Sequence, residues 1–127
     1  MKFLMGIAIA GTSAAVALLA TATPTTAQTP AAAPPAFNAC KACHTVNKGG
    51  RNGIGPNLNG VVGRPAASVA GFNYSPAMKA SKLRWDAKTL DAYLAAPAKK
   101  VPGTRMPIAT PDAAKRAAII AYLTSAK

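Results

Sequence analysis

The chain has 127 residues, enough for one domain, and its formal net charge is +12, from 15 Lys and Arg against 3 Asp and Glu. A surface this basic predicts an acidic partner; nucleic acid is not expected, because the chain shows a signal for export and no nucleic-acid recognition motif. Large apolar residues are few for a domain of this size, which makes a core built from side chains alone marginal and predicts that a cofactor supplies apolar bulk.

Residues 1–22 have the pattern of a secretory signal peptide, in which Lys2 precedes an apolar run that ends in small residues. Cleavage is expected after residue 22 or residue 27, which would place the protein in the periplasm. An uncleaved membrane anchor is the competing interpretation, because the run from Phe3 to Ala22 approaches the ~20 residues that span a bilayer. The many alanines make this run weakly hydrophobic and favour cleavage.

Residues 23–35 are rich in Ala, Pro and Thr and are predicted to form a disordered tether. The ordered domain is therefore expected to cover residues 36–127. A short helix is predicted over residues 36–46, and either Gly49 or Gly50 is expected to end it in the left-handed conformation.

Loops and two capped helices are predicted next. Residues 51–74 are dense in Gly, Pro and Asn and show no alternation long enough for a strand. Ser75 is expected to cap a short helix with Pro76 at its first position. Asp86 is expected to cap a longer helix that stops before Pro97. The shared face of this longer helix consists of Leu90, Tyr93 and Leu94.

The last predicted helix starts at Thr110 as its cap, with Pro111 behind it. Its expected apolar stripe consists of Ala113, Ala117, Ile120 and Leu123, with Ile119 and Tyr122 beside them. The predicted fold class is all-α, with three to four short helices and long loops.

Two cysteines and the chain's single histidine stand together in the string CKACH, as Cys40, Cys43 and His44. On a helix the three side chains project from one face. A disulfide would close a tiny loop and stabilise little, and no third cysteine or second histidine completes a zinc site. Thioredoxin-type chemistry needs strands that this chain lacks. The spacing is instead typical of covalent haem attachment, with two thioethers and an axial imidazole.

The sixth ligand of such an iron has to come from elsewhere in the chain. With no other histidine, methionine is the natural candidate, and the chain after the signal segment has only Met78 and Met106. Met78 falls in a predicted short helix, where apolar filler is the simpler interpretation. Met106 stands in the Pro-framed loop VPGTRMP, and we expect it to bind the iron.

Six motifs in order carry a resemblance to a known family: CKACHTV, GPNLNG, GFNYSPAM, WDAKTLDAYLAAP, VPGTRMP and IIAYL. Together they resemble a bacterial class I cytochrome c, related to the mitochondrial protein. The resemblance covers about residues 36–126 and rests on several spaced motifs. It implies a small cytochrome c-type fold around one haem c, attached covalently through Cys40 and Cys43.

The resemblance also implies roles for single residues. The carbonyl of Pro56 is expected to accept a hydrogen bond from the His44 imidazole and so to fix its tautomer. The other implied haem contacts are Arg64, Tyr74 and Trp85 at the propionates, and Tyr93 and Thr104 near Met106 and the propionates. The chain departs from the family pattern at Met78, Ala96 and Ile108, and at Pro34 and Pro35, which shorten the first helix.

With His44 and Met106 on the iron, no position is left for a substrate, which predicts an electron carrier and no enzyme. The expected function is a monomeric periplasmic shuttle of single electrons between membrane redox complexes. Its expected partners are acidic docking faces of quinol–cytochrome c reductase, cytochrome c oxidase or a photosynthetic reaction centre. The basic side chains expected around the haem edge are Lys41, Lys48, Lys99, Lys100 and Arg105.

Three alternatives stay open. One is a five-coordinate haem enzyme or sensor in which Met106 does not bind the iron. Another is a membrane-tethered cytochrome that keeps residues 1–22 as an anchor. The third is a basic thiol-redox or binding protein without haem.

Overall fold

The computed structural model describes Gly11 and residues 31–127. The predicted signal segment, Gly11 apart, and most of the predicted tether lie outside these described residues. Within them the chain forms helices and loops, and extended backbone pairs at one isolated antiparallel bridge, between Pro65 and Arg84. The prediction of an all-α fold with short helices and long loops is confirmed.

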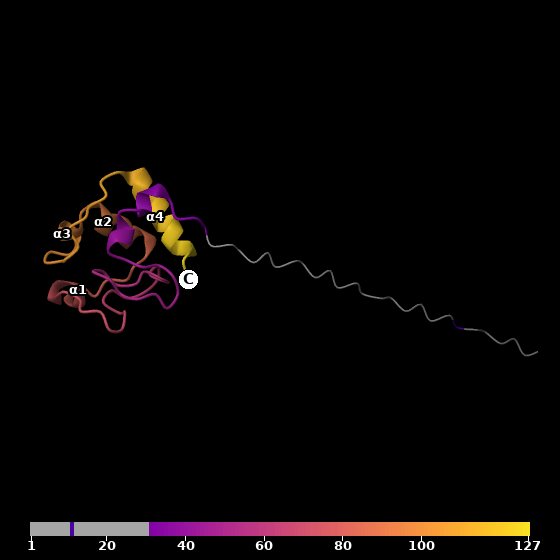
Figure 1. Cartoon of the computed structure of the whole chain (residues 1–127), viewed down its shortest axis with the longest axis horizontal. Helices are drawn as coiled ribbons and strands as arrows, with labels where there is room; N and C mark the ends of the chain where they lie inside the picture. The colour runs from indigo at the N-terminus through magenta and orange to yellow at the C-terminus, as the bar shows by residue number, and fades with distance from the viewer. Residues whose placement is uncertain (1–10, 12–30) are drawn as a thin grey trace, which may run out of the picture.

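The helical elements, with 3-10 helices marked η, are in chain order η1 (Pro35–Phe37), η2 (Cys40–Ala42), α1 (Pro76–Ala80), α2 (Ala87–Ala95), α3 (Pro97–Lys100) and α4 (Ala113–Ser125). α2 packs against α3 and α4, and η1 packs against α4. Figure 1 shows this arrangement, with α1 set apart from α4. In the part of the chain that is described, no helix is long and apolar enough to cross a membrane.

The helix predicted over residues 36–46 is wrong, because two separate 3-10 turns stand there. Pro34 and Pro35 stand at the cap and the first position of η1, where proline is tolerated, and the backbone leaves the helical conformation at Cys43. The turn of η1 is closed by the amide of Phe37, which donates to the carbonyl of Pro34 at 2.8 Å.

The turn of η2 presents the CKACH string. The carbonyl of Cys40 accepts hydrogen bonds from the amides of Cys43 and His44, at 3.1 and 2.9 Å. The chain leaves the helical conformation at Cys43, whose φ is −121°. Gly49 does adopt the predicted left-handed conformation, with φ +72°, but it lies in a turn and ends no helix.

The caps of α1 and α2 are as predicted. The Ser75 hydroxyl accepts from the amide of Met78 at 3.1 Å, and the Asp86 carboxylate accepts from the amide of Thr89 at 2.7 Å. α2 ends at Ala95, before Pro97. The short α3 was not predicted: Pro97 stops α2 and starts a new turn, because a proline fits the first helical position.

The start and the buried face of α4 differ from the prediction. Asp112, and not Thr110, is the cap, and its carboxylate accepts from the amide of Lys115 at 3.0 Å. Thr110 is tied instead to α2, since its amide donates to the carbonyl of Leu94 at 2.7 Å. Of the predicted stripe, Ala113 and Ala117 are exposed; the buried residues of α4 are Ile119 and Leu123.

The buried apolar residues of the described chain are Phe37, Val61, Met78, Trp85, Leu90, Tyr93, Val101, Ile119 and Leu123. All of them except Val101 also line one internal cavity of about 400 Å³. The buried residues therefore surround a cavity instead of filling the interior, which agrees with the shortage of large apolar residues in the sequence.

Candidate haem site

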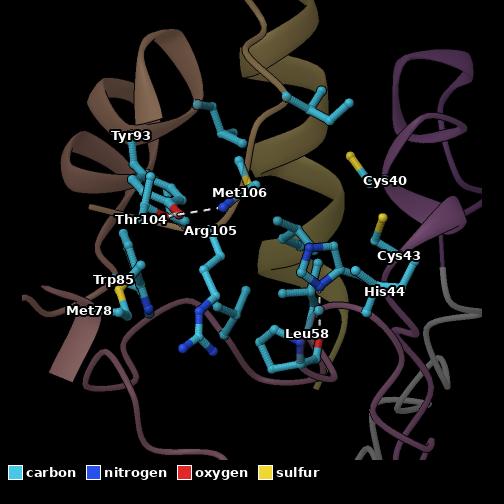
Figure 2. Close-up of a pocket in the computed structure, with 18 of the residues that line it drawn as sticks. Cys40, Cys43, His44, Leu58, Met78, Trp85, Tyr93, Thr104, Arg105 and Met106 are labelled. Carbon is cyan, nitrogen blue, oxygen red and sulfur yellow. Dashed lines mark hydrogen bonds between the residues drawn. The ribbon is translucent and has the colours of Figure 1, made fainter. Parts of the chain in front are cut away.

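The cavity brings together residues from both ends of the described chain (Figure 2). Cys40, Cys43 and His44 line it from η2 and the residues after it, and Met106 lines it from the loop between α3 and α4. Every other residue that the sequence placed at the haem also lines it: Pro56, Arg64, Tyr74, Trp85, Tyr93 and Thr104. The loops, and not helix faces, carry most of these side chains.

The imidazole of His44 is oriented by the backbone. Its Nδ1 lies 2.7 Å from the carbonyl oxygen of Pro56. A carbonyl only accepts, so Nδ1 carries the proton and Nε2 keeps its lone pair for a metal. This is the contact that the sequence resemblance implied for Pro56.

Gly55 is a site residue that the sequence analysis missed. A Cβ atom built on Gly55 would lie 2.2 Å from Cε1 and 2.7 Å from Nε2 of His44. The amide of Gly55 also donates to the carbonyl of Cys43, at 2.9 Å. The bare backbone of Gly55 therefore packs against the imidazole ring, and any side chain there would displace one of the two. Its signal in the sequence was its place directly before Pro56.

The two cysteines are free thiols, both partly buried at the cavity wall. Burial raises the pKa of the Cys40 thiol, and the nearby Cys43 adds to the rise. Both thiols lie on the same side of the cavity as His44 (Figure 2). This arrangement suits two thioether bonds to one planar group that also meets the imidazole.

Arg64 lines the cavity and carries an unused hydrogen-bond donor. Its guanidinium donates to the carbonyls of Asn59 and Asn57, at 3.0 and 3.1 Å, while its buried Nε has no partner in the described structure. Burial lowers the pKa of Arg64, although a guanidinium stays charged. An unpaired buried donor on a permanent cation suits an anionic group in the cavity. A haem propionate is such a group.

Asn57 is a second residue that the sequence analysis missed. It is only 9% exposed, and its amide nitrogen donates to Thr45 Oγ1 at 2.7 Å and to the carbonyl of Asn47 at 3.0 Å. Its amide oxygen accepts from the backbone of Asn59 at 2.9 Å. These bonds fasten the segment that follows Pro56 to the chain after His44. A buried polar residue in a Gly/Pro loop was the available signal.

Aromatic side chains form the wall near Met106. The rings of Trp85 and Tyr93 pack with centroids 5.0 Å apart. The hydroxyls of Tyr93 and Thr104 lie 2.6 Å apart, and the amide of Met106 donates to Thr104 Oγ1 at 3.4 Å. Burial raises the pKa of Tyr93, so this hydroxyl keeps its proton through the neutral range.

The two candidate methionines occupy different environments. Met78 is 8% exposed and belongs to α1, and its sulfur is drawn next to Trp85 in Figure 2, far from His44. Met106 is partly buried on a loop and stands opposite the wall formed by Cys40 and Cys43.

Of the basic residues expected around the haem edge, Arg105 lines the cavity. The others, Lys41, Lys48, Lys99 and Lys100, are exposed and do not line it. Two large apolar side chains at its opening are also exposed: Ile54 at 81% and Ile108 at 51%.

The residues present therefore fit a covalently attached haem: an apolar cavity, two thiols, an imidazole with a free Nε2 and an unpaired cationic donor. Neither a β-sheet nor a second histidine is required for these residues to hold a haem.

Comparisons with known proteins agree with this description. The family described as Cytochrome c matches residues 30–127. The chain is 51% identical over 94 residues to cytochrome c2 iso-2 of Magnetospirillum fulvum, covering 73% of this chain and 97% of that protein. It is 49% identical over 92 residues to cytochrome c2 of Rhodoblastus acidophilus, covering 72% of this chain and 86% of that protein.

Two further likenesses are informative. A cytochrome c-type cyt cy of Rhodobacter capsulatus is 51% identical over 87 residues, which are 68% of this chain but 43% of that longer protein. The solved structure of cytochrome cH from Methylobacterium extorquens superposes with a TM-score of 0.66 at 48% identity, covering 71% of this chain and 91% of the other.

Proposed function

Since this chain belongs to the cytochrome c family, we propose that His44 and Met106 are the axial ligands of its haem and that it shuttles single electrons in the periplasm. The family and the cytochrome c2 relatives make it a mono-haem electron carrier and not an enzyme. One haem c is attached through Cys40 and Cys43.

The single observation that carries the ligand set is the geometry of His44. Its Nδ1 donates to the Pro56 carbonyl at 2.7 Å, and Gly55 leaves the ring no room to turn away. The imidazole is thus fixed with Nε2 free, within a cavity that Met106 lines from a different loop. Two protein ligands would leave no position for a substrate.

The bound haem supplies one-electron chemistry between Fe(II) and Fe(III). The chain's own residues set how easily that happens. The apolar wall disfavours the extra charge of Fe(III), and the soft thioether of Met106 favours Fe(II), so the reduction potential is expected to be high for a haem. The guanidinium cation of Arg64 also raises the expected reduction potential, because it opposes the additional positive charge of Fe(III).

The partners are redox complexes, and we propose that this chain docks on acidic surfaces of those complexes. All three acidic residues serve the fold: Asp86 and Asp112 cap helices, and Asp91 pairs with Arg116 at 2.7 Å. The exposed lysines therefore form a positive surface with little compensation. Quinol–cytochrome c reductase, cytochrome c oxidase and a photosynthetic reaction centre are the proposed partner classes.

The location is proposed from residues 1–22 alone, whose pattern predicts export. Amino-terminal sequencing of the exported protein separates cleavage after residue 22 or 27 from retention of an anchor.

The ligand set is tested by two matched methionine substitutions. We expect Met106→Ala to abolish the sulfur-to-iron charge-transfer band and to allow carbon monoxide to bind Fe(II). Met78→Ala removes the same kind of side chain from the lining of the same cavity, and we expect it to keep the band and only to lower stability, by about 2–5 kcal/mol as for other buried methionines. The reverse result would assign Met78 as the ligand. Carbon monoxide binding by the unmodified protein would favour a five-coordinate sensor or enzyme.

A further inference from the structure

The loop that carries Met106 is held by hydrogen bonds before this residue but not directly after it. Just before Met106, Thr104 is held by the Tyr93 hydroxyl at 2.6 Å. Just after it, residues 107–109 are exposed, and the chain is next tied down where the amide of Thr110 donates to α2 at 2.7 Å. In the described part of the chain, residues 107–109 therefore form no hydrogen bond of their own, so little holds this part of the cavity wall in place.

Arg105 directly precedes Met106, and it forms a bond across the cavity opening. Its Nη1 donates to the carbonyl of Asn73, 32 positions away in sequence, at 3.0 Å. Both residues line the cavity. Figure 2 shows the Arg105 side chain extending away from Thr104 and Met106. The bond joins the loop of Met106 to the loop before α1.

The accepting side of this bond is itself fixed. Next to Asn73, the hydroxyl of Tyr74 accepts from the amide of Val69 at 3.1 Å. The same loop is tied to the chain after His44, because Asn52 Nδ2 donates to the carbonyl of Ala70 at 3.3 Å. A bond to Asn73 therefore restrains the Met106 loop and does not merely join two mobile loops.

We propose that Arg105 is a positioning residue for Met106, which keeps residues 106–109 closed over the cavity through its bond to the Asn73 carbonyl. This inference rests on the proposed ligand set. Small molecules that compete with Met106 for the iron must first displace this segment. The bond to Asn73 therefore controls how fast they enter, while the ligands in the closed state stay the same.

The test measures imidazole binding to the ferric protein by the loss of the sulfur-to-iron band. Arg105→Gln is expected to raise the affinity and the binding rate by about two- to tenfold, the equivalent of one net hydrogen bond. The band before imidazole is added should be unchanged. Arg105→Lys keeps a charged donor without the planar fork and should restore part of the restraint.

Arg84→Gln is the matched control. Arg84 is also exposed and also donates from Nη1 to a distant backbone carbonyl, that of Gly63, but it does not line the cavity. The Arg84→Gln variant should leave imidazole binding unchanged, even if it lowers the free energy of unfolding as much as Arg105→Gln does. An unchanged rate in Arg105→Gln, or equal increases in both variants, would overturn the positioning role.

Hydrogen exchange separates this inference from the proposed ligands. The amides of Thr104 and Met106, which donate to the Val101 carbonyl and to Thr104 Oγ1, should exchange faster in haem-loaded Arg105→Gln and not in Arg84→Gln. This readout does not depend on which sulfur binds the iron. Absence of the sulfur-to-iron band in the unmodified protein would overturn the ligand set alone, whereas unchanged exchange in Arg105→Gln would overturn the role of Arg105.

Discussion

At the scale of single residues, the site depends on backbone as much as on side chains. Pro56 contributes a carbonyl, Gly55 contributes the absence of a Cβ, and together they leave His44 one orientation and one tautomer. A fixed imidazole needs no rearrangement when the iron changes charge, which suits repeated electron transfer. The cost is that Gly55 tolerates no side chain.

Gly55→Ala is therefore expected to disturb His44, the proposed metal ligand, and not only the fold. The added Cβ would approach His44 Cε1 to 2.2 Å, so the ring or the loop must move. We expect a loss of about 1–3 kcal/mol in the free energy of unfolding, as for other overpacked sites, together with a shifted reduction potential. Thermal unfolding and potentiometry of the purified holoprotein measure both.

Gly60→Ala is the control for Gly55→Ala. A Cβ at Gly60 meets nothing within 4 Å, but its φ of +64° makes a side chain strained. It should lower stability by about 1 kcal/mol and leave the potential unchanged. Equal shifts of potential in both variants would mean that Gly55 acts through general stability.

At the scale of elements, the short helices depend on their caps and on contacts to the loops. Asp86 and Asp112 cap α2 and α4, and both carboxylates accept from the amide three positions on. Arg116 of α4 pairs with Asp91 of α2 and donates to the carbonyl of Thr110 at 3.0 Å. The same arginine thus joins two helices and the end of the Met106 loop.

The caps predict an acid sensitivity. Hydrogen bonds from backbone amides lower the pKa of Asp86 and of Asp112 below the usual value near 4. As pH falls through that range the unfolded chain takes up protons before the folded one, so stability present at neutral pH is lost toward acid pH. Asp86→Asn with Asp112→Asn keeps both caps and should flatten the loss between about pH 4 and pH 2. Urea unfolding at a series of pH values measures it, and an unchanged slope would contradict the assignment.

At the scale of the whole molecule, the cavity makes folding depend on the cofactor. At the value of about 24 cal/mol per Å³ for a closed, dry cavity, a space of about 400 Å³ sets an upper limit on the order of 10 kcal/mol. This is comparable to the whole stability of a small domain. A haem in this cavity would thus complete the core that the side chains leave open.

Cys40→Ser with Cys43→Ser is expected to leave a chain without a cooperative thermal transition when haem is withheld. The reason is that the remaining side chains cannot offset the conformational entropy of folding. Circular dichroism during heating measures this, with the unmodified holoprotein as the reference. A sharp transition in the haem-free variant would contradict the proposed role of the haem in the core.

The charge distribution predicts a salt-dependent association. With the physiological partner, the second-order rate should fall steeply as salt rises, because the Debye length shrinks from ~30 Å at 0.01 M to ~10 Å at 0.1 M. Lys99→Glu with Lys100→Glu, on α3, should slow association several-fold at low salt and little at high salt. Stopped-flow measurements over a salt series test this.

Lys88→Glu with Lys115→Glu is the matched control. Both lysines are exposed in the first turn of α2 and of α4, where a glutamate is compatible with the helix. Arg116 is unsuitable because its side chain is 12% exposed and paired with Asp91. If both double variants slow association equally, the positive charge is a general property of the surface and no docking face lies near α3.

The sequence by itself determined the parts of this protein whose chemistry is local. The spacing of Cys40, Cys43 and His44 predicted haem attachment, and Ser75 and Asp86 predicted their helix starts, because thioether formation and capping involve groups a few residues apart. The shortage of large apolar residues likewise predicted that a cofactor would occupy the core.

Only the tertiary structure decided what depends on distant partners. Asp112 caps α4 while the amide of Thr110 is held by Leu94 of α2, and only Cys40–Ala42 of the CKACH string form a 3-10 turn. The fit of Gly55 against His44 and the bond from Arg105 to Asn73 depend on loops that approach each other in space. Local propensity cannot specify such contacts, since their energy exists only once the chain has closed around the cavity.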